Sequence, residues 1–189
     1  MKSVSVGSVV TEMPFMQQRS SFEIVPVRST QDLTATAALF EAYATSLDVD
    51  LGYQDFAAEL AGLPGLYAPP RGELLLGRGP DGMPVGCAAL RPMELRGCCE
   101  MKRLYVSPGA RGLGLGKALV EAMIAVAERL GYREMRLDTL PSMKDAQALY
   151  RRLGFEITDP YYETPVAGTL FMRRVLGSLP TFQDNFSKS

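Results

Sequence analysis

Apolar and polar positions follow two different periods along this chain. Alternation with a period of about two residues, or a short apolar run, predicts strands at residues 22–28, 73–78, 85–90, 99–106, 134–139, 155–157 and 168–175. Apolar positions three or four residues apart predict helices at residues 33–44, 54–60, 115–130 and 143–153. Elements mixed in this order predict an α/β (α+β mixed) fold, in which helices cover both faces of one mixed sheet.

Turn-forming residues mark the ends of these elements. The turn Gly79-Pro80-Asp81-Gly82 joins two predicted strands, so we expect a hairpin there. Pro26 lies inside the first predicted strand and cannot donate to a neighbour, which favours an edge position. Gly131 and Gly154 each follow a helical stripe and are expected to end the helix.

The chain length favours a single domain. A chain of 189 residues can bury a core without metals or disulfides. Residues 1–20 have no clear period, so we expect a flexible N-terminal extension, then one domain over residues 21–176 and a polar C-terminal tail over residues 177–189. No window approaches the roughly 20 apolar residues of a membrane helix, so we expect a cytoplasmic protein with no membrane partner.

The composition argues against several kinds of site. The formal net charge is −1, without the basic excess typical of nucleic-acid-binding proteins, so no nucleic-acid partner is expected. The chain has no histidine, which removes the commonest general base and zinc ligand. Cys87, Cys98 and Cys99 are odd in number and two are adjacent, so we expect buried free thiols and no metal site.

A glycine-rich segment, Arg111-Gly112-Leu113-Gly114-Leu115-Gly116-Lys117, joins a predicted strand to a predicted helix. Glycines let the backbone turn sharply and approach a ligand. The free N–H groups at a helix start bind anions such as pyrophosphate, and Arg111 and Lys117 can add charged contacts. The Walker phosphate motif is not matched, because Ala118 replaces its magnesium-binding hydroxyl. The dinucleotide motif is not matched either, because Lys117 takes the place of its last glycine.

Three motifs in order resemble the GNAT superfamily of N-acetyltransferases. The glycine segment is similar to that family's Arg-x-x-Gly-x-Gly pattern. Residues 103–108 (Arg-Leu-Tyr-Val-Ser-Pro) resemble its fourth strand, and residues 149–155 (Leu-Tyr-Arg-Arg-Leu-Gly-Phe) resemble its late Leu-Tyr-x-x-x-Gly-Phe segment. The resemblance covers residues 22–176. It implies a single GNAT-like domain with a central, mostly antiparallel sheet of six to seven strands, splayed between strands 4 and 5 and flanked by about four helices.

The resemblance also implies an acetyl-CoA site and no metal. Pantetheine would lie between the splayed strands, and the loop amides would hold the pyrophosphate. The cofactor-binding residues expected on this basis are Leu104, Tyr105, Val106, Arg111, Gly112, Leu113, Gly114, Leu115, Gly116 and Lys117. One position departs from the family, which often carries an asparagine seven residues before the motif tyrosine, where this chain has Met143.

Acyl transfer to an amine requires a deprotonated amine, a stabilised oxyanion and a protonated leaving thiolate. The resemblance places Tyr150 as the general acid, although its position on an apolar helical stripe also fits a core aromatic residue. Glu100 is the candidate base, because strict alternation would put it on the strand face of Leu104 and Val106. Asp138 and water are the alternatives.

The predicted protein is therefore an acyltransferase enzyme that passes an acetyl group from acetyl-CoA to a primary amine of a small molecule or peptide by direct attack. The alternatives are a non-catalytic acyl-CoA-binding regulatory module and a structural domain without a cofactor. Tyr53, Tyr67, Arg91 and the loop at residues 65–71 are candidate walls of the amine site. Homodimers are common in the family, so a homodimer is also an expectation.

Overall fold

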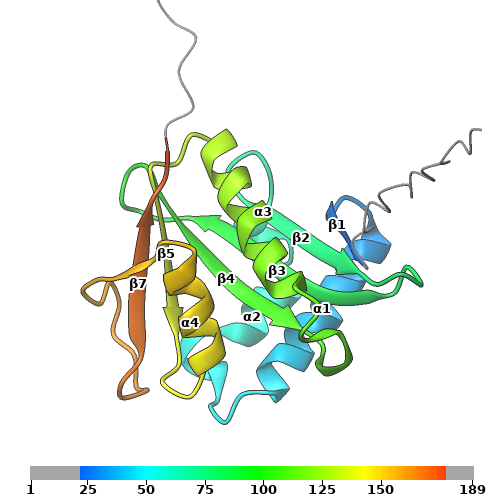
Figure 1. Cartoon of the computed structure of the whole chain (residues 1–189), viewed down its shortest axis with the longest axis horizontal. Helices are drawn as coiled ribbons and strands as arrows, with labels where there is room; N and C mark the ends of the chain where they lie inside the picture. Colours follow the sequence, from blue (N-terminus) through cyan, green and yellow to red (C-terminus); the bar gives the residue numbers. More distant parts are fainter. Residues whose placement is uncertain (1–21, 178–189) are drawn as a thin grey trace, which may run out of the picture.

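A computed structural model describes residues 22–177, which form one seven-stranded sheet (Figure 1). Neighbouring strands are antiparallel except β4 and β5, which run parallel. The predicted mixed, mostly antiparallel sheet is confirmed. The predicted extension at residues 1–20 and residues 178–189 of the predicted tail lie outside the described residues. In spatial order the strands are β1 Glu23–Pro26, β2 Glu73–Arg78, β3 Pro84–Pro92, β4 Cys98–Val106, β5 Glu134–Thr139, β7 Leu170–Val175 and β6 Glu156–Ile157.

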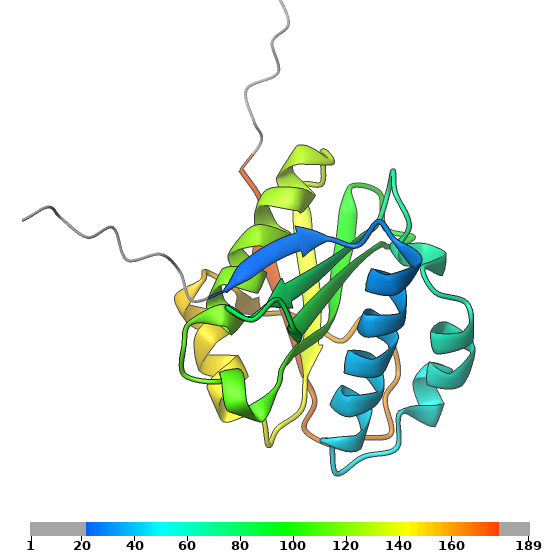
Figure 2. The same cartoon turned by 90° about the vertical axis from the view of Figure 1, so that its right-hand side faces the viewer.

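Four α-helices of the described chain cover the two faces of the sheet. Helices α3 (Leu115–Arg129) and α4 (Lys144–Arg152) lie on one face, and α1 (Thr30–Thr45) and α2 (Phe56–Ala61) lie on the other (Figures 1 and 2). Each face has its own cluster of buried apolar side chains. None of the helices in residues 22–177 combines the length and apolar character needed to cross a membrane.

Local signals account for most helix and strand ends. A capping box begins α1, in which the Ser29 side chain accepts a hydrogen bond from the Asp32 backbone N–H and the Asp32 carboxylate accepts one from Ser29. Pro26 ends β1 at the edge of the sheet, as predicted. The helix predicted at residues 54–60 is instead a 3-10 helix, Leu51–Gln54, followed by α2. Asp55 separates the two with a left-handed φ of 54°, which aspartate tolerates better than most residues. Two more 3-10 helices are Gly65–Tyr67 and Pro108–Ala110.

Two glycines in the sheet let α3 approach closely. A Cβ atom added at Gly77 would lie 2.9 Å from the Leu115 side chain. A Cβ atom added at Gly86 would lie 3.0 Å from the Leu115 side chain and 3.0 Å from the Tyr105 carbonyl oxygen. Glycine in a strand interior often marks such a close approach. The first turn of α3, and the glycine loop before it, are thereby held against the sheet.

Strands β4 and β5 separate partway along their length. Pairing joins Cys98–Glu100 to Glu134–Arg136 and stops there, although β4 continues to Val106 and β5 to Thr139. The predicted splay between strands 4 and 5 is therefore present. Its wedge exposes the backbone of β4 to the space between the strands, where pantetheine is expected.

A β-bulge at Arg103 interrupts the alternation of β4. Cys87 of β3 pairs with Tyr105 and Ala89 pairs with Lys102, so β4 contains one residue more than β3 over this interval. Arg103 has a φ of 56°. The bulge reverses which side chains face α3: Cys99 and Met101 do so before it, and Leu104 and Val106 do so after it.

The prediction that Glu100 shares a strand face with Leu104 and Val106 is consequently wrong. Strict alternation would have held only in a regular strand. Because the bulge adds one residue, Glu100 and Lys102 lie on the face opposite α3 and α4, where Glu100 contacts Arg91 and Lys102 contacts Asp138.

Candidate active site

A large groove of the described chain runs along the splay between β4 and β5. Its volume is about 740 Å³, and we call it the cofactor groove. Its walls come from β4, the glycine loop, the start of α3, α4 and the end of α1. All the predicted cofactor-binding residues line it except Leu113, whose side chain is exposed to solvent.

The glycine loop is shaped by two left-handed residues, Gly112 with a φ of 79° and Gly114 with a φ of 85°. Other residues adopt this conformation only at a cost. Gly114 is the N-cap of α3, and no side chain caps this helix. Its first N–H groups are therefore left for a ligand, and the positive end of the helix dipole lies at the same point. The arrangement suits a pyrophosphate.

Two basic residues beside the loop are engaged elsewhere in this structure. Arg111 donates from Nε to the Val106 carbonyl oxygen at 3.1 Å, across the edge of β4. Lys117 pairs with Glu121 one turn further along α3 at 2.8 Å, and both side chains are well exposed. A pantetheine paired with the Val106 carbonyl would compete with Arg111, which would then be free to turn toward the phosphates.

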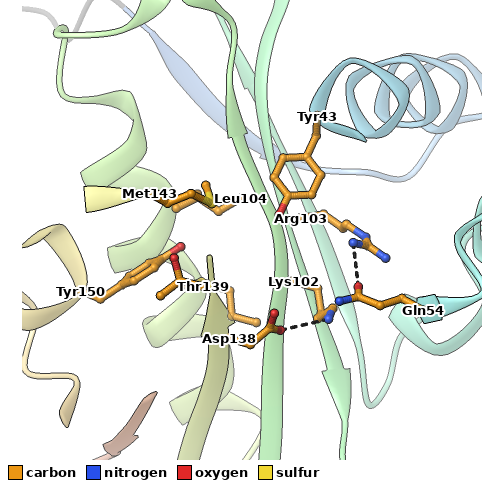
Figure 3. Close-up of a pocket in the computed structure, with 10 residues that line it drawn as sticks. Tyr43, Gln54, Lys102, Arg103, Leu104, Asp138, Thr139, Met143 and Tyr150 are labelled. Atoms are coloured by element: carbon orange, nitrogen blue, oxygen red, sulfur yellow. Dashed lines mark hydrogen bonds and ion pairs between the residues drawn. The ribbon is translucent and has the colours of Figure 1, made fainter. Parts of the chain in front are cut away.

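A small cavity lies at the inner end of the groove, at the point where the strands part. We call it the junction cavity; its volume is about 30 Å³, and Tyr43, Leu104 and Met143 line both it and the cofactor groove. Figure 3 shows Tyr150 and Thr139 on one side of the strands and Lys102, Arg103 and Gln54 on the other. Asp138 lies between them and is joined to Lys102 (Figure 3).

Tyr150 comes from α4 and is 5% exposed. Its ring packs edge-on against Phe155 with centroids 5.7 Å apart, so the core-aromatic interpretation describes part of its role. Burial raises the pKa of the Tyr150 phenol above its usual range, so the hydroxyl is protonated at neutral pH. Tyr150 also lines the junction cavity, where a proton donor to a departing sulfur would have to lie. Both interpretations therefore remain compatible with its position.

Glu100 is almost fully buried and bonded on both carboxylate oxygens. Arg91 donates to Oε2 at 2.7 Å from Nε, and Tyr161 donates to Oε1 at 2.9 Å. Lys102 Nζ is 3.9 Å from Oε1. Glu100 does not line the junction cavity, whereas Asp138, the rival base, does.

A polar cavity continues from the junction toward α2. Its volume is about 130 Å³, and it shares Gln54, Lys102 and Arg103 with the junction cavity. An outer cavity of about 310 Å³ follows and shares Gln54, Glu59 and Arg91 with the polar cavity. Of the predicted wall residues, Tyr53 and Arg91 line the polar cavity, and Tyr67 lies in the outer one.

Arg103 anchors α2 to the polar cavity. Its side chain is 2% exposed, and its Nη2 lies 2.5 Å from Glu59 Oε2. Its Nη1 donates to Gln54 Oε1 at 3.1 Å. Burial alone would lower the pKa of Arg103, but the bonds and charge of Glu59 outweigh burial and raise it. The bulge thus turns a cation toward the helix that covers this side of the sheet.

Sequence reasoning missed several residues that this structure gathers at the junction. They are Tyr43, Gln54, Lys102, Arg103, Thr139 and the loop residues Tyr161 and Tyr162. The one available signal was the adjacent basic pair Lys102-Arg103 in a strand whose only other charged residue is Glu100, since buried cations are rare unless they are paired. Nothing in the local pattern indicates that Tyr161 and Tyr162 return over the sheet to pack on Phe171.

Comparison with solved structures gives the class of protein that this fold defines. A GNAT-family acetyltransferase from Staphylococcus aureus superposes with a TM-score of 0.69 at 19% identity, over 82% of this chain and 99% of that one. A GNAT superfamily phosphinothricin acetyltransferase from Sinorhizobium meliloti, solved in complex with acetyl-CoA, has a TM-score of 0.62 at 22% identity, over 83% of this chain and 89% of that one. The fold of this chain is the one that these two GNAT proteins share.

Sequence comparison assigns the family. The model of the acetyltransferase (GNAT) family matches residues 35–155. An uncharacterized N-acetyltransferase of Schizosaccharomyces pombe is 42% identical over 158 residues, which is 84% of this chain and 97% of the relative. The chain belongs to the GNAT family and is an acyltransferase, so the predicted resemblance is confirmed.

Proposed function

We propose that this enzyme transfers an acetyl group from acetyl-CoA to the primary amine of a small molecule or peptide by direct attack. One observation carries the proposal: the junction cavity shares lining residues with the cofactor groove and with the polar cavity, so the three cavities lie next to one another. Acetyl-CoA would enter from the side of α3 and α4, and the amine from the side of α2. The acetyl-CoA bound to the Sinorhizobium protein of similar fold supports this choice of donor.

The chemistry needs two proton transfers at the junction. The amine nitrogen attacks the thioester carbonyl carbon, a C–N bond forms, and the C–S bond then breaks. The nitrogen loses one proton to a base, and the departing thiolate gains one from an acid. Tyr150 is our candidate for the acid, because its hydroxyl is protonated at neutral pH and its side chain lines the junction.

Asp138 becomes the better candidate base. Its carboxylate lines the junction cavity and is bonded to Lys102 at 3.1 Å. Both oxygens of Glu100 are bonded already, and Glu100 lies outside the lining of this cavity. We therefore propose that Glu100 acts as a positioning residue that holds Arg91 and Lys102, while Asp138 accepts the amine proton directly or through water.

The test measures CoA release over a panel of amines for the wild type and for Tyr150→Phe, with acetyl-CoA affinity measured by calorimetry. We expect kcat to fall by about 10²-fold or more, the usual scale of general acid–base catalysis, with little change in affinity. Tyr132→Phe is the matched control, because its hydroxyl donates to the Arg71 carbonyl oxygen away from the groove. Near-normal turnover of Tyr150→Phe would return Tyr150 to the core-aromatic interpretation.

The roles of Asp138 and Glu100 can be distinguished by the kinetics of their variants at different pH values. Asp138→Asn should lower kcat most at neutral pH and recover in part at high pH, where the amine is already neutral in solution. Glu100→Gln should mainly raise KM, because it loosens Arg91 and Lys102 without removing the base. The opposite pattern would restore Glu100 as the base. Tight CoA binding without turnover on any amine would favour the regulatory-module alternative.

A further inference from the structure

The charges that line the polar cavity are mostly positive. Arg91, Lys102 and Arg103 are its cations, and Glu59 is its one carboxylate among the described residues. Glu59 is already bonded twice by Arg103, from Nε at 2.9 Å and from Nη2 at 2.5 Å, and once by the Tyr67 hydroxyl at 2.7 Å. An incoming polycation would find no free carboxylate in this cavity.

Arg91 is a cation of this cavity whose guanidinium has an edge free of hydrogen bonds within the described residues. Its Nε and Nη2 both bond Glu100 Oε2, at 2.7 and 2.6 Å. Within residues 22–177 its Nη1 has no hydrogen-bond partner, and the side chain is 32% exposed. Arg91 lines both the polar and the outer cavity. A guanidinium fixed on one edge by a buried carboxylate presents its other edge in a set orientation, which suits a second carboxylate.

The site also disfavours a protonated acceptor. Lys102 is 6% exposed and lies between the polar cavity and the junction, bonded to Asp138. A cation beside the reacting nitrogen lowers the pKa of the incoming ammonium and so favours the neutral amine that attacks. The positive charge that favours a neutral amine at one end of the acceptor would also attract an anionic group at its other end.

We propose that the acceptor is a small amino carboxylic acid, whose carboxylate binds Arg91 while its amine reaches the junction beside Asp138. The proposal rests on the proposed function. The volumes agree with a small acceptor, since the polar cavity holds about 130 Å³ and the outer cavity, which can take a side chain, about 310 Å³.

The first test uses the wild-type protein and matched acceptors. For several side chains, kcat/KM is compared among the amino acid, its primary amide and the amine that lacks the carboxyl group, with spermidine as a polycation. We expect the acid to exceed both analogues by at least about tenfold, the lower end for a hydrogen bond to a charged group. Equal or better rates with amides, bare amines or spermidine would overturn the proposal, although acetyl transfer itself would then be established.

If no acceptor of the panel is acetylated, the carboxylate site is tested by measuring ligand binding. N-acetylated amino acids and their amides are titrated by calorimetry against the protein saturated with CoA. Binding of the acids alone supports the carboxylate site, and equal binding of both, or of neither, overturns it. CoA affinity, measured in the same series, reports separately on the proposed function.

Variants at Arg91 then test whether this residue causes the preference for the amino acid over its amide. Removing Arg91 alone would leave Glu100 buried without its partner and risks misfolding. The double change Arg91→Gln with Glu100→Gln removes both charges together, and Glu100→Gln alone is the matched control. We expect the preference for acid over amide to fall to about one in the double variant. In the control it should be reduced but stay above one, because Glu100→Gln loosens Arg91 and leaves its charge in place. Persistence in the double variant would exclude Arg91 as the carboxylate site.

A second inference rests on a different observation, the hydroxyl of Thr139. This residue ends β5, is 3% exposed and lines the junction cavity beside Tyr150 (Figure 3). Within residues 22–177 its Oγ1 is buried and has no hydrogen-bond partner. An unsatisfied buried hydroxyl costs on the order of 1–3 kcal/mol, so a threonine here has no advantage for stability over valine of the same shape.

We infer that Thr139 Oγ1 donates a hydrogen bond to the thioester of the bound acyl donor. Thr139→Val removes the hydroxyl and keeps the shape, and Thr139→Ser keeps the hydroxyl. We expect Thr139→Val to melt no lower than wild type without ligand, and to lose about 2–10-fold of the preference for acetyl-CoA over free CoA, the range of one neutral hydrogen bond. Thr139→Ser should keep that preference. A lower melting temperature with an unchanged preference would make the hydroxyl structural and overturn the inference.

Discussion

At the scale of single residues, the ion pair between Arg103 and Glu59 links the bulge of β4 to α2. The side chains are 2% and 12% exposed, so the pair is largely shielded from solvent. Burial by itself raises the pKa of Glu59, but the bonds and charge of Arg103 outweigh it and hold the pKa below its ordinary value of 4.5. A carboxyl group whose pKa is lowered by folding stabilises the protein above its unfolded pKa and loses that effect as the pH falls.

Glu59→Gln should therefore lower the free energy of unfolding at pH 7 by about 3 kcal/mol, as expected when one partner of a buried pair is removed. Below pH 4.5 the wild type should lose stability with falling pH more steeply than the variant, because only the wild type must protonate Glu59. Urea unfolding between roughly pH 3 and 7 measures both effects. Glu94→Gln, at an exposed position, is the control. Parallel curves for wild type and Glu59→Gln would exclude this role.

The cysteines give a second prediction at this scale. All three are buried and free, and burial raises the pKa of each thiol. Since the thiolate is the reactive form, we expect no measurable reaction of the native protein with Ellman's reagent over minutes, and three equivalents after unfolding in guanidinium chloride, one for each cysteine. Fast labelling of the native protein would show that at least one thiol is accessible.

Individual site residues were predictable where a motif named them and not otherwise. Tyr150 and the glycine loop could be named as candidates because their motifs are local in the sequence, and the structure places them at the junction cavity and the cofactor groove. Glu100 was placed on the wrong face because a two-residue period was extended through a bulge that no local pattern marked. Lys102 and Arg103 were left unassigned because their partners, Asp138 and Glu59, lie 36 and 44 residues away.

At the scale of elements, the two glycines that flank α3 allow its role in cofactor binding to be tested. Gly114 precedes this helix with a φ of 85°, and Gly131 follows it with a φ of 82°. Neither glycine has an atom within 4 Å of where a Cβ would lie, so a substitution at either position causes backbone strain without a clash. The two glycines differ in location, because Gly114 lines the cofactor groove and Gly131 does not.

Alanine at either position should cost about 1–2 kcal/mol of stability, the usual penalty of the left-handed region. Only Gly114→Ala should also weaken CoA binding, because it disturbs the loop that presents the free N–H groups of α3. Thermal unfolding and calorimetric titration with CoA separate the two effects. Equal CoA affinity in both variants would contradict the assignment of the pyrophosphate to this loop.

Elements were more predictable than contacts between them. Periods and breakers placed all seven strands and the four helices, because those signals act over a few residues. The split at Asp55 was missed, since the rare left-handed conformation of a non-glycine residue follows from tertiary packing and leaves no periodic signal. The tyrosines of residues 161–162 were missed because the loop that carries them has no period at all.

At the scale of the whole molecule, the sheet would separate the two substrates of the proposed reaction. The cofactor groove lies on the side of α3 and α4, the polar cavity lies on the side of α2, and the junction cavity lies between them where β4 and β5 part. A cofactor bound in the groove would contact α1, β4, the glycine loop and α4 together. Its binding should therefore stabilise the fold as a unit.

CoA at about 100 times its Kd should add about 2.7 kcal/mol to the stability, which corresponds to a rise in Tm of roughly 5–10 °C for a domain of this size. Differential scanning fluorimetry with increasing CoA measures the rise, and pantetheine without the nucleotide should produce much less of it. An unchanged Tm at high CoA would argue against a cofactor in the groove.

The bulge at Arg103 divides β4 into two parts, and the alternation of side chains is opposite in the two parts. Before it, odd-numbered side chains face the cofactor side; after it, even-numbered ones do. Deleting this one residue would remove the bulge and restore regular alternation, in which Met101, Leu104 and Val106 still face α3 and Tyr105 still faces α1. The two faces of the strand would be kept, and the loss would fall on the ion pair between Arg103 and Glu59. Relatives of this protein that lack residue 103 should therefore keep the apolar side chains of this strand and lack a carboxylate at position 59.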